Sequence, residues 1–495
     1  MLPTLQNYIN GQWVASESGA WLDVENPSTG EPIARTPLSG QQECERAIEA
    51  AQAAFDTWRC TAAGARVEPL FRLASLLRNR QEELARTIAE EMGKSLPDAR
   101  AEMKRAIQNC EVACGTPMLQ QGTRLLDAAE GVDGEVLRRP IGVCAMAGPF
   151  NFPAMVPFWF LPYALATGNT FVMKPSEKVP LTMARITECI EEIGLPPGVF
   201  NMVHGDRHVV EALVDHPTVR AFSIVGSTPA CRAVAARCAG LDKRFQAFGG
   251  AKNHLVVMPD APLDLAVRNM LTSCFGCAGQ RCMAASVLVA VGDAMYQTLR
   301  ERFVAAAKEV PVADPLDPAV ADDPMVMGPV ISGQAKRSIH EMIEKGIEEG
   351  ATLALDGRSQ AVAGRPGGHY VGPTVFTDVR PGMRIHRTEI FGPVVCVMRA
   401  ASLDEAIGVI NAHAYGNGAS IYTQNAAWAR RFKLETRVGM IGVNVGIPAP
   451  VAYMPFGGVK ASMLSAVKTQ GPDIIDFYTD PVTVTERFWS GHSES

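Results

Sequence analysis

The sequence has no Gly-x-Gly-x-x-Gly motif, the usual phosphate-binding loop of dinucleotide-binding folds. It also lacks a long apolar run, because the longest, residues 154–166, covers about 13 residues and contains Pro157 and Pro162. A membrane-spanning helix needs roughly 20 apolar residues. Residues 1–8 carry neither the basic segment nor the apolar segment of a secretion signal. We therefore expect neither a membrane protein nor one exported by such a signal.

The chain also lacks a block of charges of one sign. Lys and Arg number 46 and Asp and Glu 52, which leaves a net charge of −6. Nucleic acids and anionic membranes are bound through an excess of cations, so neither is expected as the main partner. The 495 residues, 47% hydrophobic and 20% charged, are typical of a soluble globular protein with two or three domains.

The 12 cysteines are scattered among hydrophobic residues and are not grouped as in a disulfide framework. This suits reduced, buried thiols, so we predict a cytoplasmic protein, or one of an organelle matrix if a transit peptide has been removed. One stretch gathers Cys274, Cys277 and Cys282. No second Cys/His group with ligand spacing follows, so we predict no metal. Cys274 and Cys277 are interpreted as small buried residues on a helix, and Cys282 as a nucleophile.

Hydrophobic periodicity predicts a helical block followed by alternating strands and helices. Helices are expected from Gln41 to about Ala113, with one long helix marked by leucines from Leu70 to Leu84 and another through residues 101–114. Residues 126–140 are polar and poor in strand-forming residues. Strands are expected at 142–147, 170–173, 200–203, 221–225, 254–258, 286–291 and 393–398, with helices at 154–167, 180–193, 206–215 and 229–240. This alternation predicts an α/β protein with two doubly wound parallel sheets in tandem.

Two of the expected strands end in groups suited to a dinucleotide. Lys174 and Glu177 offer a donor and an acceptor to ribose hydroxyls, and the Gly226-Ser227-Thr228 turn offers free N–H groups to a pyrophosphate at a helix start. The alternatives are a solvated Lys/Glu pair and an ordinary helix N-cap.

Together with these two motifs, further stretches resemble the aldehyde dehydrogenase superfamily over nearly the whole chain. The resemblance is carried, in order, by Pro149-Phe-Asn-Phe-Pro153, Lys174-Pro-Ser-Glu177, Gly226-Ser-Thr228, Gly279-Gln-Arg-Cys282, Glu389-Ile-Phe-Gly-Pro393, Asn444 and Pro455-Phe-Gly-Gly458. It implies an NAD-binding domain at 1–123 and 142–250, a catalytic domain at 251–443 and a small β oligomerisation arm at 124–141 and 465–490. The arm implies a homo-oligomer, either a dimer or a tetramer.

The resemblance also implies roles for individual residues. Cys282 is the nucleophile and Asn151 an oxyanion donor, together with the backbone N–H of Cys282. Contacts to the cofactor are implied for Phe150, Lys174, Glu177, Gly226, Ser227, Phe248, Glu389 and Phe391. The acidic Glu177 would repel a 2′-phosphate, which favours NAD over NADP. Cys231 replaces a glycine that is frequent after the Gly-Ser turn, which implies an altered approach of the pyrophosphate.

One departure from the family concerns the fate of the acyl group. Most members carry a Glu-Leu-Gly-Gly-Lys motif whose glutamate activates water, and Phe248 stands at that position in Phe248-Gly-Gly-Ala-Lys252. Without that base a thiol is the better acceptor, which predicts coenzyme A as co-substrate. The motifs 251–254, 279–283, 158–162 and 444–448 are similar to the CoA-acylating methylmalonate-semialdehyde dehydrogenase branch.

That branch binds a short carboxylated substrate with two arginines, which match Arg105 and Arg281. Arginine suits carboxylates because its N–H groups can bind both oxygens. The alternative for Arg105 is a surface charge on a helix. The resemblance implies methylmalonate or malonate semialdehyde as substrate and propionyl-CoA or acetyl-CoA as product, with decarboxylation. Residues 461–467 depart from the branch, which leaves the exact substrate open. Two other readings remain: a hydrolytic enzyme that releases the free acid, and a non-catalytic structural protein on the same fold.

Overall fold

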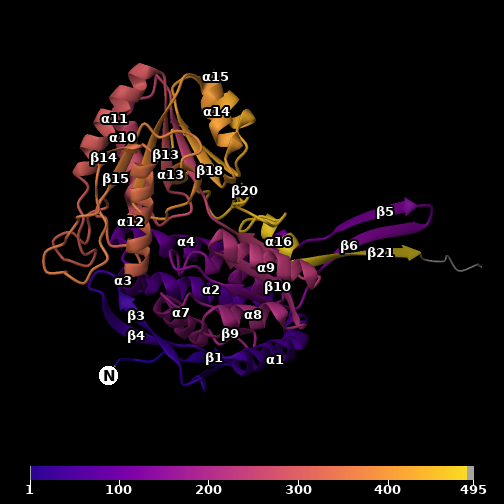
Figure 1. Ribbon diagram of the computed structural model, residues 1–495. Coiled ribbons are helices and arrows are strands. Elements are labelled where there is room, and N and C mark those ends of the chain that lie inside the picture. Colours follow the sequence, from indigo (N-terminus) through magenta and orange to yellow (C-terminus); the bar gives the residue numbers. More distant parts are fainter. Residues whose placement is uncertain (1, 488–495) are drawn as a thin grey trace, which may run out of the picture.

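The computed structural model describes residues 2–487 and contains two α/β layers and a projecting arm (Figure 1). The first layer is a seven-stranded sheet in the order β11-β10-β7-β8-β9-β1-β2. Its strands are β1 (Asn7–Ile9), β2 (Gln12–Val14), β7 (Val143–Ala147), β8 (Thr170–Lys174), β9 (Phe200–Met202), β10 (Val219–Val225) and β11 (Arg244–Phe248). The five strands from β7 to β11 run parallel, whereas β1 and β2 are antiparallel. The carboxyl ends of the parallel strands therefore meet at one edge.

Helices cover this sheet and form the lower body in Figure 1. They are α1 (Gln41–Trp58), α2 (Ala63–Asn79), α3 (Gln81–Met92), α4 (Leu96–Cys114), α5 (Thr116–Leu119), α6 (Leu161–Ala166), α7 (Leu181–Glu192), α8 (Arg207–Asp215) and α9 (Thr228–Gly240). The single long helix expected from Leu70 to Leu84 is wrong. Arg80 leaves helical geometry at φ −98° and ψ 13°, so α2 and α3 are separate. The helix expected at 154–167 is also shorter, because the 3-10 turn Pro157–Trp159 precedes α6.

The second seven-stranded sheet has the order β14-β15-β16-β13-β12-β18-β19. Its strands are β12 (Asn253–Val257), β13 (Ala285–Val291), β14 (Thr352–Leu355), β15 (Thr374–Thr377), β16 (Val394–Ala400), β18 (Gly418–Tyr422) and β19 (Met440–Val443). The helices around it are α10 (Leu263–Phe275), α11 (Asp293–Lys308), α12 (Gly333–Glu348), α13 (Arg384–Arg387), α14 (Leu403–Ala412) and α15 (Ala426–Glu435). Only β14 pairs in antiparallel fashion within this sheet. The prediction of two largely parallel α/β layers is confirmed.

The arm is a three-stranded sheet that projects from the body (Figure 1). It consists of β5 (Thr123–Ala129), β6 (Val132–Pro140) and β21 (Thr479–Arg487), in the order β21-β6-β5. The low strand propensity read from 126–140 was misleading, because cross-strand pairing with the distant β21 overrides local preference. The part of the expected arm at 488–490 lies outside the described residues.

Smaller elements complete the fold. Two-stranded sheets are formed by β3 (Trp21–Asn26) with β4 (Glu31–Pro37) and by β17 (Tyr415–Gly416) with β20 (Val459–Lys460), and α16 (Asp473–Tyr478) precedes β21. Within residues 2–487 no helix is long and apolar enough to cross a membrane. All 12 cysteines are free thiols, and ten of them are buried.

Candidate active site

A cleft of about 470 Å³ lies where the carboxyl edge of the first sheet faces the second layer. It is lined by Gly148, Pro149, Phe150, Asn151, Ser176, Glu177, Lys178, Val225, Gly226, Ser227, Gly249, Gly250, Cys282, Glu389 and Phe391. The first twelve of these residues follow or end strands β7, β8, β10 and β11. The cleft thus brings together Phe150, Asn151, Glu177, Gly226, Ser227, Cys282, Glu389 and Phe391, all of which were expected to act in one site.

Lys174 and Glu177 form an ion pair beside the cleft. The Nζ atom of Lys174, at the end of β8, lies 2.6 Å from Oε2 of Glu177. Burial alone would raise the pKa of Glu177, but the Lys174 cation brings it below its usual value. Glu177 therefore presents a carboxylate to the cleft, as a ribose-binding acceptor requires.

The Gly226-Ser227 turn leads directly into α9. Ser227 occupies the N-cap position, but its side chain makes no capping hydrogen bond, so the N-cap interpretation does not account for its hydroxyl. The N–H groups of a helix start, with the helix dipole, favour an anion. Cys231 is turned inward, where its Sγ lies 3.2 Å from the carbonyl oxygen of Phe248. It fills space below the turn and is not a lining residue of the cleft.

Glu389 and the glycine pair 249–250 form the opposite wall. Oε1 of Glu389 accepts a hydrogen bond from the backbone N–H of Ala251 at 2.8 Å. A Cβ atom at Gly250 would meet this carboxylate, so a larger residue there would displace the Glu389 side chain. Burial raises the pKa of Glu389 to about 7. Phe391 meets the ring of Phe150 edge to face, with 5.7 Å between centroids.

The carbonyl of Cys282 is held by two amides. It accepts hydrogen bonds from Nδ2 of Asn253 at 2.8 Å and from Nδ2 of Asn417 at 2.9 Å. Cys282 as a whole is partly exposed, and it lines the cleft. Burial of the sulfur, followed by the negative charge of Glu389, raises the pKa of this thiol to about 12. Without a further positive charge the sulfur is therefore a neutral thiol at physiological pH.

The turn before Cys282 has an unusual backbone. Cys277, Ala278 and Gly279 have φ values of 51°, 52° and 70°, which is a short left-handed turn. Such conformations are costly for residues other than glycine and persist where the surroundings enforce them. The expectation that Cys277 lies on a helix is thus wrong, because α10 ends at Phe275. Cys274 does lie in the last turn of α10, and it is buried as predicted.

Asn151 follows β7 in the loop 148–155 and reaches the residue before Arg281. Its Nδ2 donates a hydrogen bond to the carbonyl oxygen of Gln280 at 3.0 Å. An amide nitrogen carries two N–H groups, so one hydrogen remains beyond this bond. Asn151 thereby joins the cleft to the nucleophile turn.

The two arginines have different surroundings. Arg281 is almost fully buried, forms an ion pair with Asp98 and lies against Gly276, where a side chain would clash with its guanidinium group. Arg105 lies on α4, half-buried, with its Nη1 3.4 Å from Oε1 of Gln108. Within the described part of the chain no ion pair involves Arg105. Neither arginine lines the cleft that holds Cys282.

Phe248 ends β11 and packs into the core. Its ring centroid lies 6.1 Å from that of Phe160, and the residue is buried. The cleft wall at this point is formed by Gly249 and Gly250, not by the Phe248 ring. Cys282 packs against the same hydrophobic cluster.

Several residues of the site were not expected from the sequence. They are Asn253 and Asn417, which hold the carbonyl of Cys282, and Lys94, Asp98 and Glu102, which lie behind the cleft. The last three follow one another at four-residue spacing, which puts Asp98 and Glu102 on one face of α4 and Lys94 just before the helix. That pattern was the available signal.

The fold, the cleft and its thiol define a class of enzyme. The profile of the aldehyde dehydrogenase family matches residues 13–484, and the chain belongs to this family. It is 45% identical to malonate-semialdehyde dehydrogenase 1 of Geobacillus kaustophilus (strain HTA426), over 98% of both chains. It is 44% identical to the malonate-semialdehyde dehydrogenase of Pseudomonas aeruginosa (strain PAO1), over 98% of this chain and 96% of that protein.

Two crystal structures are similar over 99% of both chains. One is the Sinorhizobium meliloti 1021 protein assigned as methylmalonate-semialdehyde dehydrogenase and complexed with NAD, with a TM-score of 0.96 and 40% identity. The other is methylmalonate-semialdehyde dehydrogenase from Oceanimonas doudoroffii, with a TM-score of 0.96 and 42% identity. The predicted family and branch are confirmed by these relatives.

Proposed function

We propose that the protein oxidises a short carboxylated semialdehyde with NAD, through a thioester on Cys282 that is passed to coenzyme A. The single observation that carries the last step is the residue type at position 248. A water-activating carboxylate would have to stand at residue 248, and this position holds a phenylalanine whose ring is packed on Phe160. The names of the relatives support malonate or methylmalonate semialdehyde as substrate.

The cleft residues fit NAD. Glu177 supplies a charged acceptor, Gly226 and Ser227 supply N–H groups at the start of α9, and Glu389 supplies a second acceptor. The anionic Glu177 disfavours a 2′-phosphate at the ribose, which favours NAD over NADP. When bound, NAD supplies a hydride acceptor and a positive charge.

Cys282 would then form the covalent intermediate. Its sulfur loses a proton to solvent and attacks the aldehyde carbon, and the carbonyl electron pair moves to oxygen. The second N–H of Asn151 and the backbone N–H of Cys282 stabilise this oxyanion. Return of the electron pair to the carbonyl would release a hydride to the bound cofactor and leave a thioester on Cys282. The pKa of about 12 shows how strongly the thiolate needs a nearby positive charge.

The thioester is resolved by a thiol. The sulfur of coenzyme A attacks the thioester carbon, the bond to Cys282 breaks, and Cys282 regains a proton. The substrate carboxylate is β to the thioester carbonyl, so its loss as carbon dioxide leaves an enolate, and protonation gives acetyl-CoA or propionyl-CoA. Phe248 and its apolar neighbours offer no group to deprotonate water in competition with this step.

Arg105 and Arg281 are the proposed partners of the substrate carboxylate. Arg105 brings a charge that no described acid neutralises, whereas Arg281 already shares its charge with Asp98. We therefore assign the larger share of carboxylate recognition to Arg105.

The arm and the thiols support two further parts of the proposal. Leu125 and Leu126 on β5 are 64% and 65% exposed, so an apolar surface is available to a second copy, as in a dimer or tetramer. Twelve free cysteines suit a reducing compartment such as the cytoplasm.

The proposal is tested by following NADH formation from malonate, methylmalonate and succinate semialdehydes, with and without coenzyme A. We expect NADH, carbon dioxide and acetyl-CoA or propionyl-CoA, with turnover that requires coenzyme A. Full-rate turnover without coenzyme A that yields only the free acid would establish the hydrolytic alternative instead. Absence of NADH with every aldehyde tried would favour a structural protein.

A further inference from the structure

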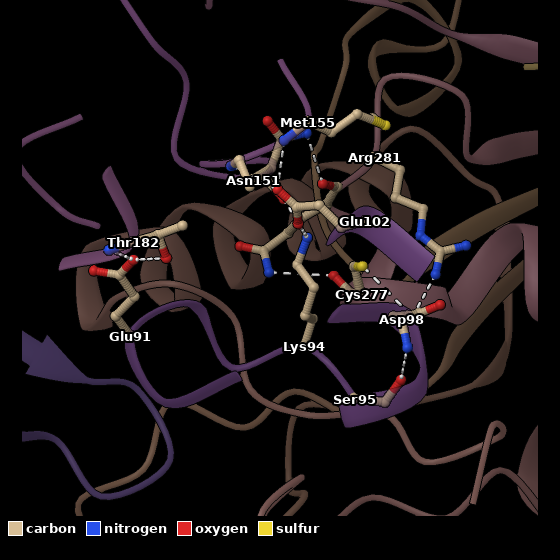
Figure 2. A network of polar contacts seen from close by, with 12 residues as sticks. Glu91, Lys94, Ser95, Asp98, Glu102, Asn151, Met155, Thr182, Cys277 and Arg281 are labelled. Carbon is tan, nitrogen blue, oxygen red and sulfur yellow. Dashed lines mark hydrogen bonds and ion pairs between the residues drawn. The ribbon is translucent and has the colours of Figure 1, made fainter. Parts of the chain in front are cut away.

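A network of charged residues stands behind the cleft, around the start of α4 (Figure 2). Lys94 lies two residues before this helix, Asp98 in its first turn and Glu102 in its second. Ser95 caps the helix by accepting a hydrogen bond from the N–H of Asp98 at 3.3 Å. Asp98 and Glu102 are thus carried by one capped helix, and Lys94 lies directly before its cap.

Lys94 and Glu102 hold the loop of Asn151. The Nζ atom of Lys94 lies 2.6 Å from Oε2 of Glu102 and donates to the carbonyl oxygen of Asn151, also at 2.6 Å. Oε1 of Glu102 accepts hydrogen bonds from the N–H groups of Ala154 at 2.8 Å and Met155 at 3.1 Å. Both charged side chains are fully buried. A buried pair with all its partners in place allows little freedom to the loop that it holds.

Asp98 holds the turn that precedes Cys282. Its carboxylate pairs with Arg281, and its Oδ2 lies 3.6 Å from the Sγ of Cys277. Burial would raise the pKa of Asp98, but Arg281 and Lys94 keep it below its usual value, so the residue is anionic. Cys277 belongs to the left-handed turn, a conformation that needs enforcement by its surroundings, and Arg281 follows that turn directly before Cys282.

The two held segments also contact each other, because Asn151 donates to the carbonyl of Gln280. The contacts therefore close a circuit from α4 through the Asn151 loop to the nucleophile turn and back to Asp98. Figure 2 shows these side chains converging from α4 and from the two loops.

From this geometry we infer that Lys94, Asp98 and Glu102 are positioning residues, which set the oxyanion donor Asn151 and the nucleophile Cys282 in register from one helix. Asp98 acts on the nucleophile turn, and Lys94 with Glu102 acts on the Asn151 loop. The inference rests on the proposed roles of Cys282 and Asn151. It adds that α4 helps to set the distance between donor and nucleophile, together with the direct hydrogen bond from Asn151 to Gln280.

The two arms can be separated experimentally in the full-length enzyme. Asp98→Asn removes the charge that pairs with Arg281, and Glu102→Gln removes the charge that pairs with Lys94 while keeping an acceptor for the loop. Two rates are measured for each variant with NAD bound: the single-turnover formation of NADH from malonate semialdehyde, and the alkylation of Cys282 by iodoacetamide. NAD affinity and the thermal midpoint are measured alongside.

We expect Asp98→Asn to slow NADH formation about 10- to 100-fold, since misplacing a reacting group by about 1 Å can cost about 100-fold. It should also change the alkylation rate several-fold. Glu102→Gln should slow NADH formation by about tenfold and leave alkylation within twofold, since alkylation has no oxyanion. NAD affinity should stay within twofold in both variants. A general loss of structure would instead lower both rates, the NAD affinity and the thermal midpoint together.

The matched control is Asp322→Asn. Asp322 pairs with Arg100 of α4 but contacts neither the Asn151 loop nor the turn before Cys282. It should leave both rates within twofold of the wild type. The inference is overturned if Asp98→Asn and Glu102→Gln also keep both rates, or if the two variants lose both rates equally. If Asp98→Asn does not fold, the Glu102→Gln split between the two rates still decides the matter. A wild-type enzyme without NADH formation would contradict the proposed function itself, which is a different outcome.

Discussion

The two faces of the loop 276–282 meet different kinds of residue. The front faces the cleft with the Cys282 thiol, beside glycines and the Phe150–Phe391 pair. The back contacts Asp98 of α4 through Arg281 and Cys277, next to the fully buried pair of Lys94 and Glu102 that holds the Asn151 loop. The front has unused hydrogen-bonding capacity at the second N–H of Asn151, whereas the side chains of Lys94 and Glu102 at the back are engaged by each other and by the backbone of the Asn151 loop. The comparison teaches that the reacting groups and the groups that place them are chemically distinct sets.

The sharpest test of the front is Cys282→Ala. We expect the turnover rate to fall by about 10⁴-fold or more, because Cys282 carries the only thiol among the described residues that line the cleft. The measurement is NADH formation, with NAD binding by fluorescence as the control, since the cofactor wall is untouched. Substantial remaining activity would mean that a thiol of the back face, such as Cys277, can replace Cys282, and the division into two faces would fail.

The back is tested most strongly by Glu102→Ala. This change leaves the fully buried Lys94 without its carboxylate, which is expected to cost about 3–5 kcal/mol of stability. Urea unfolding should show a clearly lower midpoint. Glu82→Ala, at the exposed pair with Arg100, is the comparison and should cost less than about 1 kcal/mol. Equal effects at the two positions would show that the back is no more than ordinary surface chemistry.

Asn151→Ala tests where the front and back meet. Loss of one oxyanion donor is expected to lower the rate of NADH formation by about 100-fold. NAD affinity should hold, because the side chain contacts Gln280 and not the ribose acceptor Glu177. An unchanged rate would remove Asn151 from the reaction and leave it as a link between the loops.

The two arginines also differ, because Arg281 is paired with Asp98 and Arg105 has no ion pair among the described residues. Arg105→Leu is expected to raise the Michaelis constant for malonate semialdehyde by about tenfold and to leave that for propanal unchanged, since only the former carries a carboxylate. Steady-state kinetics with both aldehydes measures this. A parallel rise for propanal would show that Arg105 acts on structure, as Arg281 does through Asp98.

The smallest expected effect concerns pH. The negative charge of Glu389 disfavours the Cys282 thiolate and so raises its pKa. Glu389→Gln removes this charge, so the pKa should fall and alkylation of Cys282 at pH 8, in the absence of NAD, should become a few-fold faster. In the wild type the alkylation rate should keep rising up to pH 10 without a plateau. A plateau near pH 8 would contradict the buried, neutral thiol.

The front of the loop was largely predictable from the sequence. Cys282, Asn151, Glu177 and Glu389 stand in recognisable motifs, and the carboxyl ends of parallel strands gather such motifs at one edge. The two sheets followed from strand and helix alternation, and the arm followed from the family resemblance alone. Its strands are held by pairing between residues more than 300 positions apart, which local propensity cannot register.

The back was not predictable for a physical reason. The pairing of Asp98 with Arg281 joins residues that are 183 positions apart, and Asp98 stands in none of the motifs that carry the resemblance. The left-handed turn at Cys277 and Ala278 contradicts their local preferences, so a sequence reading extends the preceding helix instead. A charged residue on a helix reads as solvated unless the partner that buries it is known.

The aromatic cluster against which Cys282 packs has one more consequence. Phe248 lies on Phe160, and Trp159 stacks near Phe456 with 4.3 Å between centroids, in the same cluster against which Cys282 packs. In the proposed reaction this cluster determines how long the thioester on Cys282 persists. Water greatly outnumbers any cellular thiol, so a thioester can wait for coenzyme A only if its spontaneous hydrolysis is slow. A slower hydrolysis allows the enzyme to work at a lower concentration of coenzyme A before the thioester is lost to water.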